Sequence, residues 1–232
     1  MITKAMILAA GFGKRIHPLT LERPKPLLGI GDETLLSNTI KFLKLFGVKN
    51  VVINVHYLEK QIIEYIEKNK FQLDIKIVKE KEKILDTGGG ILNAIKNFSN
   101  ESFLVINPDT IWSSNYFKEI KLMEKMFLEN KRKKCSLLVV NKKKSFDKFM
   151  KGDFSLENSL INRNNKNKLN YIYTGVQIIH PDAFKGFTDK VFSMNLIWNK
   201  LIENKELHGL ESHNNFFHVS TLDIYNKLKK KF

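Results

Sequence analysis

The sequence is poor in cysteine and has no long apolar stretch. Its single cysteine, Cys135, excludes an internal disulfide bond and any metal cluster built from cysteine thiolates. Cys135 opens the apolar run CSLLVV, where a small core residue is expected. No apolar run approaches the roughly 18 residues that a membrane span needs. The charged residues that follow AMILAA exclude a secretory signal. These absences favour a cytoplasmic protein with no membrane partner.

Acidic residues are also scarce, with 24 against 39 lysines and arginines, which gives a formal net charge of +15. Such an excess suits a polyanionic partner. The aromatic residues, however, do not alternate with the basic ones as the stacking platforms of a nucleic-acid surface would. We therefore interpret the basic runs at 131–134 and 229–231 as solvated surface, and the composition argues against a nucleic-acid partner.

Apolar runs typical of strands alternate along the chain with helical patterns. The expected strands lie at residues 5–9, 50–55, 74–78, 102–106, 136–140, 171–179 and, in NFFHV, 215–219. The expected helices lie at 34–46, 58–66, 91–98, 194–203 and from 221 onward. The polar stretch 141–170 is expected to hold a hairpin. This alternation predicts an α/β fold with a mixed, mostly parallel sheet flanked by helices. No linker or repeat interrupts it, so residues 1–232 are expected to form one domain.

Two glycines and two basic residues follow the first expected strand. Gly11 and Gly13 lack a Cβ, so their backbone N–H groups can approach an anion closely, and Lys14 and Arg15 add positive charge. The pattern is not a Walker loop. It is not the G-x-G-x-x-G fingerprint either, since the third glycine position holds Ile16. A phosphate-binding turn and an ordinary tight turn both fit these residues.

A lysine stands between two prolines in RPKP. Because a residue before proline is pushed out of the helical region, we expect Lys25 to lie on an extended, stiffened backbone. Such rigid placement favours a lysine that meets a phosphate, although an ordinary proline turn with a solvated lysine fits the same letters.

Taken together, LAAGFGKR, RPKPLL, INVHY, DTGGGI, INPDTIW and HVSTLDIY resemble the motifs of the sugar-1-phosphate nucleotidyltransferases, from residue 2 to about residue 228. The resemblance implies a Rossmann-like fold of glycosyltransferase A type, with a nucleotide-binding part at about 1–110 and a sugar-binding part at about 111–228. Within this family, DTGGGI, GDFSL and TGVQIIHPDAF most resemble the N-acetylmuramate-1-phosphate uridylyltransferases of peptidoglycan recycling. Mannose-1-phosphate guanylyltransferases share many of these segments, and glucose-1-phosphate enzymes are a further alternative.

The resemblance also implies a reaction and its residues. A sugar-1-phosphate oxygen would attack the α-phosphorus of a nucleoside triphosphate, with UTP favoured over GTP, and pyrophosphate would leave. Arg15 and Lys25 would be catalytic. The implied nucleotide-binding residues are Ala9, Ala10, Gly11, Gly13, Lys14, Arg15 and Gly88, and the implied sugar-binding residues are Asn107, Gly152, Asp153 and Gly175. A monomer or a weak homo-oligomer is expected.

Asp109 follows Asn107 and Pro108 just past an expected strand. By resemblance Asp109 would bind Mg²⁺, which prefers carboxylate and phosphate oxygens. The alternative is a purely structural role, in which Asp109 caps a turn. The family pattern W-x-D-V-G-T supplies a second aspartate, but this chain has His218 in FFHVST. Imidazole suits Mn²⁺ better than Mg²⁺. His218 would therefore bind the metal, contact a phosphate or simply pack.

Two further points stay open in the sequence. Ser220 and Asp223 have the spacing of a capping box for the final helix.

The departure from the family pattern at His218 also supports a second class of function, a regulatory module that binds nucleotide or nucleic acid and has lost catalysis.

Overall fold

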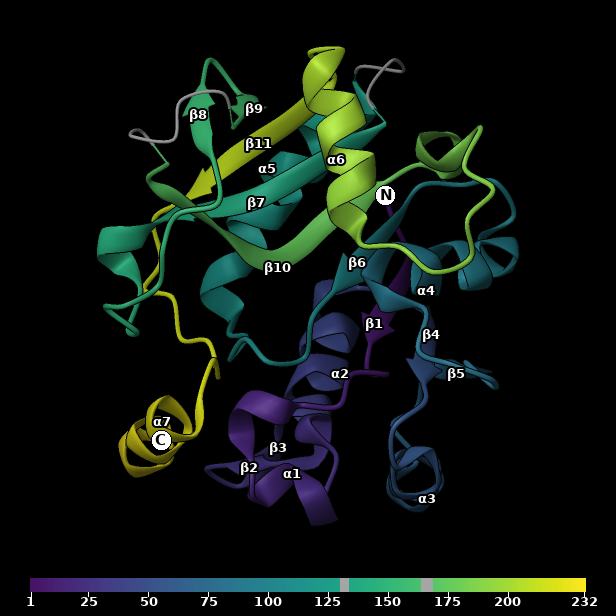
Figure 1. The fold of residues 1–232 in the computed structure, drawn as a ribbon, viewed down its shortest axis with the longest axis vertical. Coiled ribbons are helices and arrows are strands. Elements are labelled where there is room, and N and C mark those ends of the chain that lie inside the picture. Colours follow the sequence, from purple (N-terminus) through teal and green to yellow (C-terminus); the bar gives the residue numbers. More distant parts are fainter. Residues whose placement is uncertain (130–133, 164–168) are drawn as a thin grey trace.

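A nine-stranded sheet forms the centre of the protein. The computed structural model describes residues 1–129, 134–163 and 169–232, so most of the basic run 131–134 lies outside the described residues. The strand order is β5-β4-β1-β6-β10-β7-β11-β9-β8 (Figure 1). Strands β4 and β6 both pair with β1 in parallel, and β5 pairs in parallel with β4. Strand β10 is antiparallel to β6 and β7, and β11 is parallel to β7. The predicted α/β fold with a mixed, mostly parallel sheet in a single domain is confirmed.

The elements have the following bounds. The strands are β1 (Lys4–Leu8), β2 (Gly29–Ile30), β3 (Glu33–Thr34), β4 (Asn50–Val55), β5 (Asp74–Lys79), β6 (Phe103–Ile106), β7 (Cys135–Asn141), β8 (Ser155–Glu157), β9 (Leu160–Asn162), β10 (Tyr171–Ile179) and β11 (Leu207–Ser212). The α-helices are α1 (Leu19–Glu22), α2 (Leu35–Phe46), α3 (Glu59–Asn69), α4 (Asp86–Ala94), α5 (Phe117–Leu128), α6 (Met194–Glu203) and α7 (Leu222–Lys231). The short 3₁₀ helices are η1 (Lys14–Ile16), η2 (Lys25–Leu27), η3 (Ile95–Phe98), η4 (Ser114–Tyr116), η5 (Lys142–Lys144) and η7 (Pro181–Phe184).

Helices cover both faces of the sheet. Successive strand residues point to opposite faces, so Ile7 packs in the cluster that contains residues of α2 and α5, whereas Met6 packs with residues of α4 and α6. The carboxyl ends of β1, β4, β5 and β6 are left to the loops, and in sheets of this kind that edge is where ligands bind.

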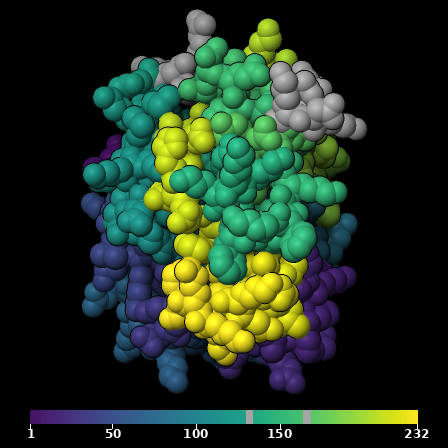
Figure 2. Space-filling model, turned by 90° about the vertical axis from the view of Figure 1, so that its left-hand side faces the viewer, coloured from purple at the N-terminus to yellow at the C-terminus, as the bar shows by residue number. Residues whose placement is uncertain are grey.

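The final helix, α7, packs on the N-terminal part of the chain. Ile224 and Leu228 of α7 share a buried cluster with Ile16 of η1, and the Tyr225 hydroxyl donates a 2.9 Å hydrogen bond to the Gly29 carbonyl oxygen. Figure 2 shows this helix, in yellow, lying between the N-terminal segments in purple and a segment of the middle of the chain. The turn that carries Arg15 is thus supported by a helix from the far end of the sequence.

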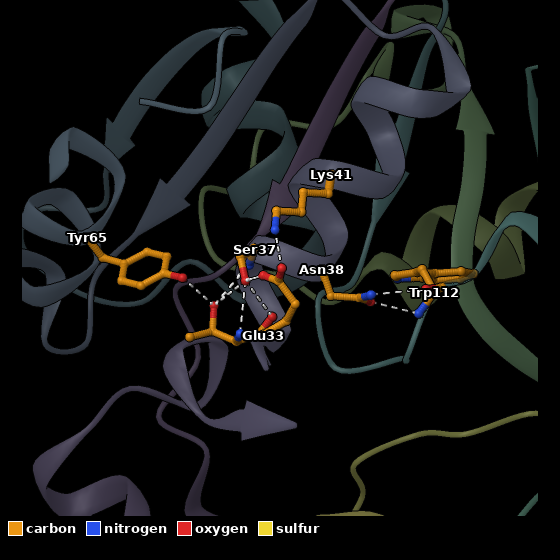
Figure 3. A network of polar contacts seen from close by, with 7 residues as sticks. Glu33, Ser37, Asn38, Lys41, Tyr65 and Trp112 are labelled. Atoms are coloured by element: carbon orange, nitrogen blue, oxygen red, sulfur yellow. Dashed lines mark hydrogen bonds and ion pairs between the residues drawn. The ribbon is translucent and has the colours of Figure 1, made fainter. Parts of the chain in front are cut away.

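A polar network fixes the start of α2. Thr34 and Ser37 form a capping box, in which the Ser37 N–H donates to Thr34 Oγ1 at 3.0 Å and the Thr34 N–H donates to Ser37 Oγ at 2.9 Å. Tyr65 of α3 contacts the same Thr34 hydroxyl, and Glu33 accepts from Ser37 and from Lys41 (Figure 3). Because the first N–H groups of a helix lack intrahelical partners, this network stabilises the entry of α2.

Several predicted elements are confirmed, and a few are wrong. The hairpin expected within 141–170 is β8–β9, and α6 spans the predicted 194–203. The segment NFFHV is not a strand but makes isolated bridges at Phe216 and His218. The N-cap of α7 is Thr221, because the Ser220 hydroxyl donates to Asp147 instead. Among the described residues, no helix is both long and apolar enough to cross a membrane.

Candidate active site

The exit of β1 forms a tight turn that carries two basic side chains. Gly13 adopts φ +65°, a left-handed conformation that glycine accepts without strain, and precedes the 3₁₀ turn that holds Lys14 and Arg15. The Thr20 hydroxyl donates to the Gly13 carbonyl oxygen at 2.9 Å and the Ile16 N–H donates to it at the same distance. The turn is therefore fixed by its own chain before any ligand binds.

Lys25 lies in a short 3₁₀ turn and not on an extended backbone. Arg23 and Pro24 are extended, with ψ 128° and 141°, and the turn that follows is closed by a 2.8 Å hydrogen bond from the Leu27 N–H to the Pro24 carbonyl oxygen. The expectation for the backbone of Lys25 is thus wrong, because this turn outweighs the bias of a residue before proline. Pro24 and the turn still hold the lysine in one place.

Asp109 is held from two sides just past the carboxyl end of β6. Its carbonyl oxygen accepts from the Val219 N–H at 2.8 Å. Farther along, Trp112 exchanges two hydrogen bonds with Asn38 of α2, of 3.0 and 3.1 Å (Figure 3). The Trp112 indole N–H also donates to the Asn107 carbonyl oxygen at 2.9 Å. These bonds fix the loop that carries the carboxylate, so Asp109 is preorganised.

The predicted catalytic residues meet in one cavity of about 390 Å³ at the carboxyl edge of β1, β4 and β6. The predicted site residues that line it are Ala9, Ala10, Gly11, Gly13, Lys14, Arg15, Lys25, Asn107 and Asp109. In its wall, Lys25 Nζ donates a 2.5 Å hydrogen bond to Asp109 Oδ2. Positive side chains and a glycine turn thus converge on one space with a carboxylate, which suits a phosphate-rich ligand.

Charge controls the titration of Asp109. Burial alone would raise its pKa, but the positive charges of Lys25, His218 and Arg15, together with the hydrogen bond from Lys25, lower the pKa to about 2. Burial lowers the pKa of His218, an effect that the charges of Lys25 and Arg15 reinforce and that of Asp109 opposes. Asp109 is therefore a carboxylate at neutral pH, and His218 favours its neutral form.

Asp109 and His218 also present atoms without a partner. Asp109 Oδ1 and His218 Nδ1 are buried, make no hydrogen bond and lie 3.5 Å apart. A buried polar atom without a partner is costly, and it often marks a position that a ligand or ion completes. The donor set fits a divalent cation that takes few protein ligands and keeps substrate oxygens and waters, as Mg²⁺ does. No group of three or more His, Cys, Asp or Glu side chains placed to hold a metal occurs in the described part of the chain.

The glycines of DTGGG lie inside a helix and pack tightly. Helix α4 begins at Asp86, five residues earlier than the helical pattern from 91 indicated. A Cβ at Gly88 would lie 2.4 Å from the Phe192 ring, and one at Gly89 would lie 2.2 Å from the Lys190 carbonyl oxygen. Gly88 does not line the cavity, whereas its neighbours Asp86 and Thr87 do. The structure thus supplies a packing reason for Gly88, and its role toward the nucleotide stays a prediction.

The predicted sugar-binding residues fall into two pairs. Gly175, with φ +97° in an irregular stretch of β10, accepts a 2.7 Å hydrogen bond from the Asn107 N–H, next to Asp109. Gly152 and Asp153 precede β8; a Cβ at Gly152 would lie 2.0 Å from the Leu169 carbonyl oxygen. Asp153 accepts from the Tyr173 N–H at 3.0 Å, and β10 thereby connects the two pairs. The sugar-binding roles of these four residues stay predictions.

Sequence reasoning missed other cavity residues, notably Asn54, Glu80 and Thr87. Asn54 and Glu80 are almost fully buried. A signal for the first was available, because Asn54 is a polar residue inside the apolar strand NVVINV. Glu80 carried no comparable signal, because it stands in the charged run KEKEK.

A family model described as nucleotidyl transferase matches residues 4–146, which is more than half of the chain. The chain belongs to the nucleotidyl transferase family. The enzyme class that the motifs predicted is thereby confirmed, and the matched residues include every predicted nucleotide-binding residue together with Lys25 and Asp109.

This nucleotidyl transferase is similar to proteins with different substrates. N-acetylmuramate alpha-1-phosphate uridylyltransferase of Caulobacter vibrioides is 27% identical over 220 residues, which cover 93% of this chain and 90% of that protein. D-glycero-alpha-D-manno-heptose 1-phosphate guanylyltransferase of Campylobacter jejuni is 30% identical over 186 residues, 79% of each chain. A solved UDP-glucose pyrophosphorylase complexed with UDP-glucose superimposes with a TM-score of 0.79 at 18% identity, over 100% of this chain and 98% of that one. This last likeness shows the fold alone.

Proposed function

We propose that this nucleotidyl transferase joins UTP to N-acetylmuramate-1-phosphate, which gives UDP-N-acetylmuramate and pyrophosphate, in peptidoglycan recycling. The observation that carries the proposal is the single cavity in which Arg15, Lys25 and Asp109 meet. A cavity lined by the basic side chains of Lys14, Arg15 and Lys25, by a glycine turn and by the Asp109 carboxylate suits a reaction between two phosphate-bearing substrates.

The reaction needs positioning and charge stabilisation more than proton transfer. An oxygen of the sugar phosphate forms a bond to the α-phosphorus, the bond from that phosphorus to the bridging β-phosphate oxygen breaks, and pyrophosphate leaves with the electron pair. The nucleophile is already an anion, so no general base is required. Arg15 can bind phosphate oxygens through two N–H groups, whereas Lys25 acts as a point charge. Both would stabilise the charge of the transition state.

A divalent cation fits the donors beside these residues. Asp109 Oδ1 and His218 Nδ1 would hold Mg²⁺ or Mn²⁺ at the buried point where both atoms lack a partner. When bound, such an ion would neutralise phosphate charge. In the ion-free protein, Lys25 offsets the negative charge of Asp109. When an ion binds to Asp109, the Lys25 ammonium would become available to the phosphates.

The choice of substrates is supported by the Caulobacter uridylyltransferase, whose likeness covers nearly all of both chains. A guanylyltransferase acting on a mannose or heptose 1-phosphate is the second candidate, because the Campylobacter heptose-phosphate enzyme has a similar identity over most of this chain.

The test is a matrix of UTP, GTP, CTP, ATP and dTTP against N-acetylmuramate-1-phosphate, mannose-1-phosphate, heptose-1-phosphate and glucose-1-phosphate, scored by pyrophosphate release with Mg²⁺ or Mn²⁺. The proposal expects the highest kcat/KM for UTP with N-acetylmuramate-1-phosphate. A higher value for GTP with mannose- or heptose-1-phosphate would establish the second candidate. If no pair releases pyrophosphate, the chain has lost catalysis, and a binding or regulatory role takes precedence.

A further inference from the structure

We propose that Glu80 is a positioning residue for the nucleotide, and that it works through Asn54 by joining two segments that border the cavity. The inference rests on the proposed function, because it assumes that the cavity binds a nucleoside triphosphate. Neither residue belongs to the motifs at the β1 exit or around Asp109, and the charges of Arg15, Lys25 and Asp109 do not depend on them.

Three hydrogen bonds connect the exit of β1 to the entry of α4. The Ala9 N–H donates to Asn54 Oδ1 at 3.0 Å, Asn54 Nδ2 donates to Glu80 Oε1 at 2.7 Å, and the Leu85 N–H donates to Glu80 Oε2 at 2.7 Å. Asn54 is 3% exposed and Glu80 is 2% exposed. The glycine turn and the start of α4 are therefore joined through two buried side chains.

The direction of each of these three hydrogen bonds is fixed. Backbone N–H groups at Ala9 and Leu85 can only donate. The amide oxygen of Asn54 must face Ala9, which leaves its NH₂ group to donate to Glu80. Both oxygens of Glu80 therefore accept, the first from Asn54 Nδ2 and the second from the Leu85 N–H. A glutamine at position 80 would turn one acceptor into a donor and place it against another donor.

Close packing and backbone hydrogen bonds hold Glu80 in place. A Cβ at Gly90 would lie 2.8 Å from Asn54 Nδ2 and 2.8 Å from Glu80 Oε1, so the glycine makes room for the pair. The Glu80 backbone is also held, since its N–H donates to the Val55 carbonyl oxygen at 2.9 Å and its own carbonyl oxygen lies 2.6 Å from His56 Nδ1.

The network borders the cavity beside the exit of β1, where the proposed function places the nucleotide. Ala9, Asn54 and Glu80 line the cavity, and Leu85 stands between the lining residues Ile84 and Asp86. The hydrogen bonds therefore set the spacing between the segment that would hold the phosphates and the segment at the α4 entry. Losing that spacing should weaken nucleotide binding and leave the sugar phosphate, at the β10 side, almost unaffected.

Exchanging the amide and the carboxylate between positions 54 and 80 tests this assignment. Glu80→Gln and Asn54→Asp each break one bond, the first by opposing two donors and the second by opposing two carboxylates. The double variant Asn54→Asp/Glu80→Gln restores all three bonds at the same net charge: the two backbone N–H groups still donate, and only the bond between the two side chains reverses its direction. We expect each single variant to raise the UTP dissociation constant and the UTP KM roughly tenfold. The KM for the sugar phosphate should stay within about twofold, and the double variant should return UTP binding close to wild type.

The matched control is Glu82→Gln, which removes the same charge from an exposed residue two positions along the same segment. It should leave both KM values unchanged. Wild-type UTP binding in Glu80→Gln, or equal weakening of both substrates, would overturn the assignment. So would a double variant that fails to fold or still binds UTP weakly, because it contains every donor and acceptor that the network needs.

These outcomes differ from a failure of the proposed function. If the wild-type enzyme neither binds nor turns over any nucleoside triphosphate, the proposed function fails. The network itself would then still be measurable, as a lowered melting temperature in each single variant and its recovery in the double variant. If the wild-type enzyme is active and Glu80→Gln is indistinguishable from it, only the present inference fails.

Discussion

Lys25 Nζ and Asp109 Oδ2 lie 2.5 Å apart and join two motifs that are 84 residues apart in the chain. Both side chains are mostly buried, with 13% and 19% exposure. A buried ion pair is weak evidence of stabilisation, because desolvation offsets much of the attraction. Its position in the cavity, beside atoms that lack partners, points to a role in binding and catalysis.

Replacement of either basic side chain should leave a folded and nearly inactive enzyme. Lys25→Met and Arg15→Ala remove the charges proposed to stabilise the reacting phosphates, and the loss of one such preorganised contact typically lowers kcat by about 10²- to 10³-fold. Pyrophosphate release under saturating substrates is the measurement, with circular dichroism to verify folding. Lys227→Met, which breaks an exposed ion pair with Asp223, is the control and should be fully active. Near-normal turnover by both active-site variants would contradict the assignment.

The depressed pKa of Asp109 should appear in the acid stability of the metal-free protein. Its pKa is about 2 in the folded state against an ordinary 3.8, so its contribution is complete above about pH 5 and is lost as the pH falls toward 2. In urea unfolding with EDTA present, the free energy of unfolding of the wild type should fall by about 1 kcal/mol more than that of Asp109→Asn when the pH is lowered from 5 to 3. Parallel curves for the two proteins over this range would show that the carboxylate is not held in its charged form.

His218 should give the enzyme an unusual preference among metals. Its neutral imidazole presents Nδ1 without a partner beside Asp109, and imidazole suits Mn²⁺ better than Mg²⁺. We expect the ratio of kcat/KM with Mn²⁺ to that with Mg²⁺ to fall severalfold in His218→Asp. His213→Asp, at an exposed position nearby in the sequence, should keep the wild-type ratio. An unchanged ratio in His218→Asp would indicate that the histidine packs or contacts a phosphate.

The two glycines of the first turn should respond differently to alanine. Gly11 has no atom within 4 Å of an added Cβ, whereas Gly13 has φ +65° and a Cβ there would lie 3.1 Å from Lys25 Cβ. Gly11→Ala should therefore keep the wild-type melting temperature but raise the UTP KM, since its methyl group would occupy space at the cavity. Gly13→Ala should lose about 1–2 kcal/mol of stability as well as activity. A Gly11→Ala protein with normal UTP affinity would exclude close approach of the nucleotide there.

The parallel half of the sheet could be predicted well from the sequence. Runs such as NVVINV are buried on both faces and read as continuous apolar segments. Because parallel strands end at one edge, residues that follow different strands, such as Gly11 and Asp109, could be expected to meet there.

The other half depends on contacts that the local sequence does not encode. Strand β11 reads LHGLES, and its Gly209 is explained by the distant side chains of Ile161 and Leu156, which lie 2.5 and 3.3 Å from where a Cβ would be. In the sequence, the glycines of α4 are typical of a ligand-binding loop. In the structure, the distant Phe192 packs against Gly88 and explains why that position needs a glycine. Glu80 could not be distinguished from its charged neighbours, because its burial is a property of the tertiary structure.

The packing of α7 against η1 has a consequence for how the enzyme becomes active. The turn with Arg15 rests on Ile16, which is completely buried beneath a helix whose Tyr225 bonds to Gly29 across 196 residues of chain. Contacts between such distant segments form late, since a long loop must close before they can stabilise anything. During synthesis the buried support of Ile16 therefore waits for residues 222–231, and until they are made the turn that carries Arg15 depends on its local hydrogen bonds to the Gly13 carbonyl oxygen.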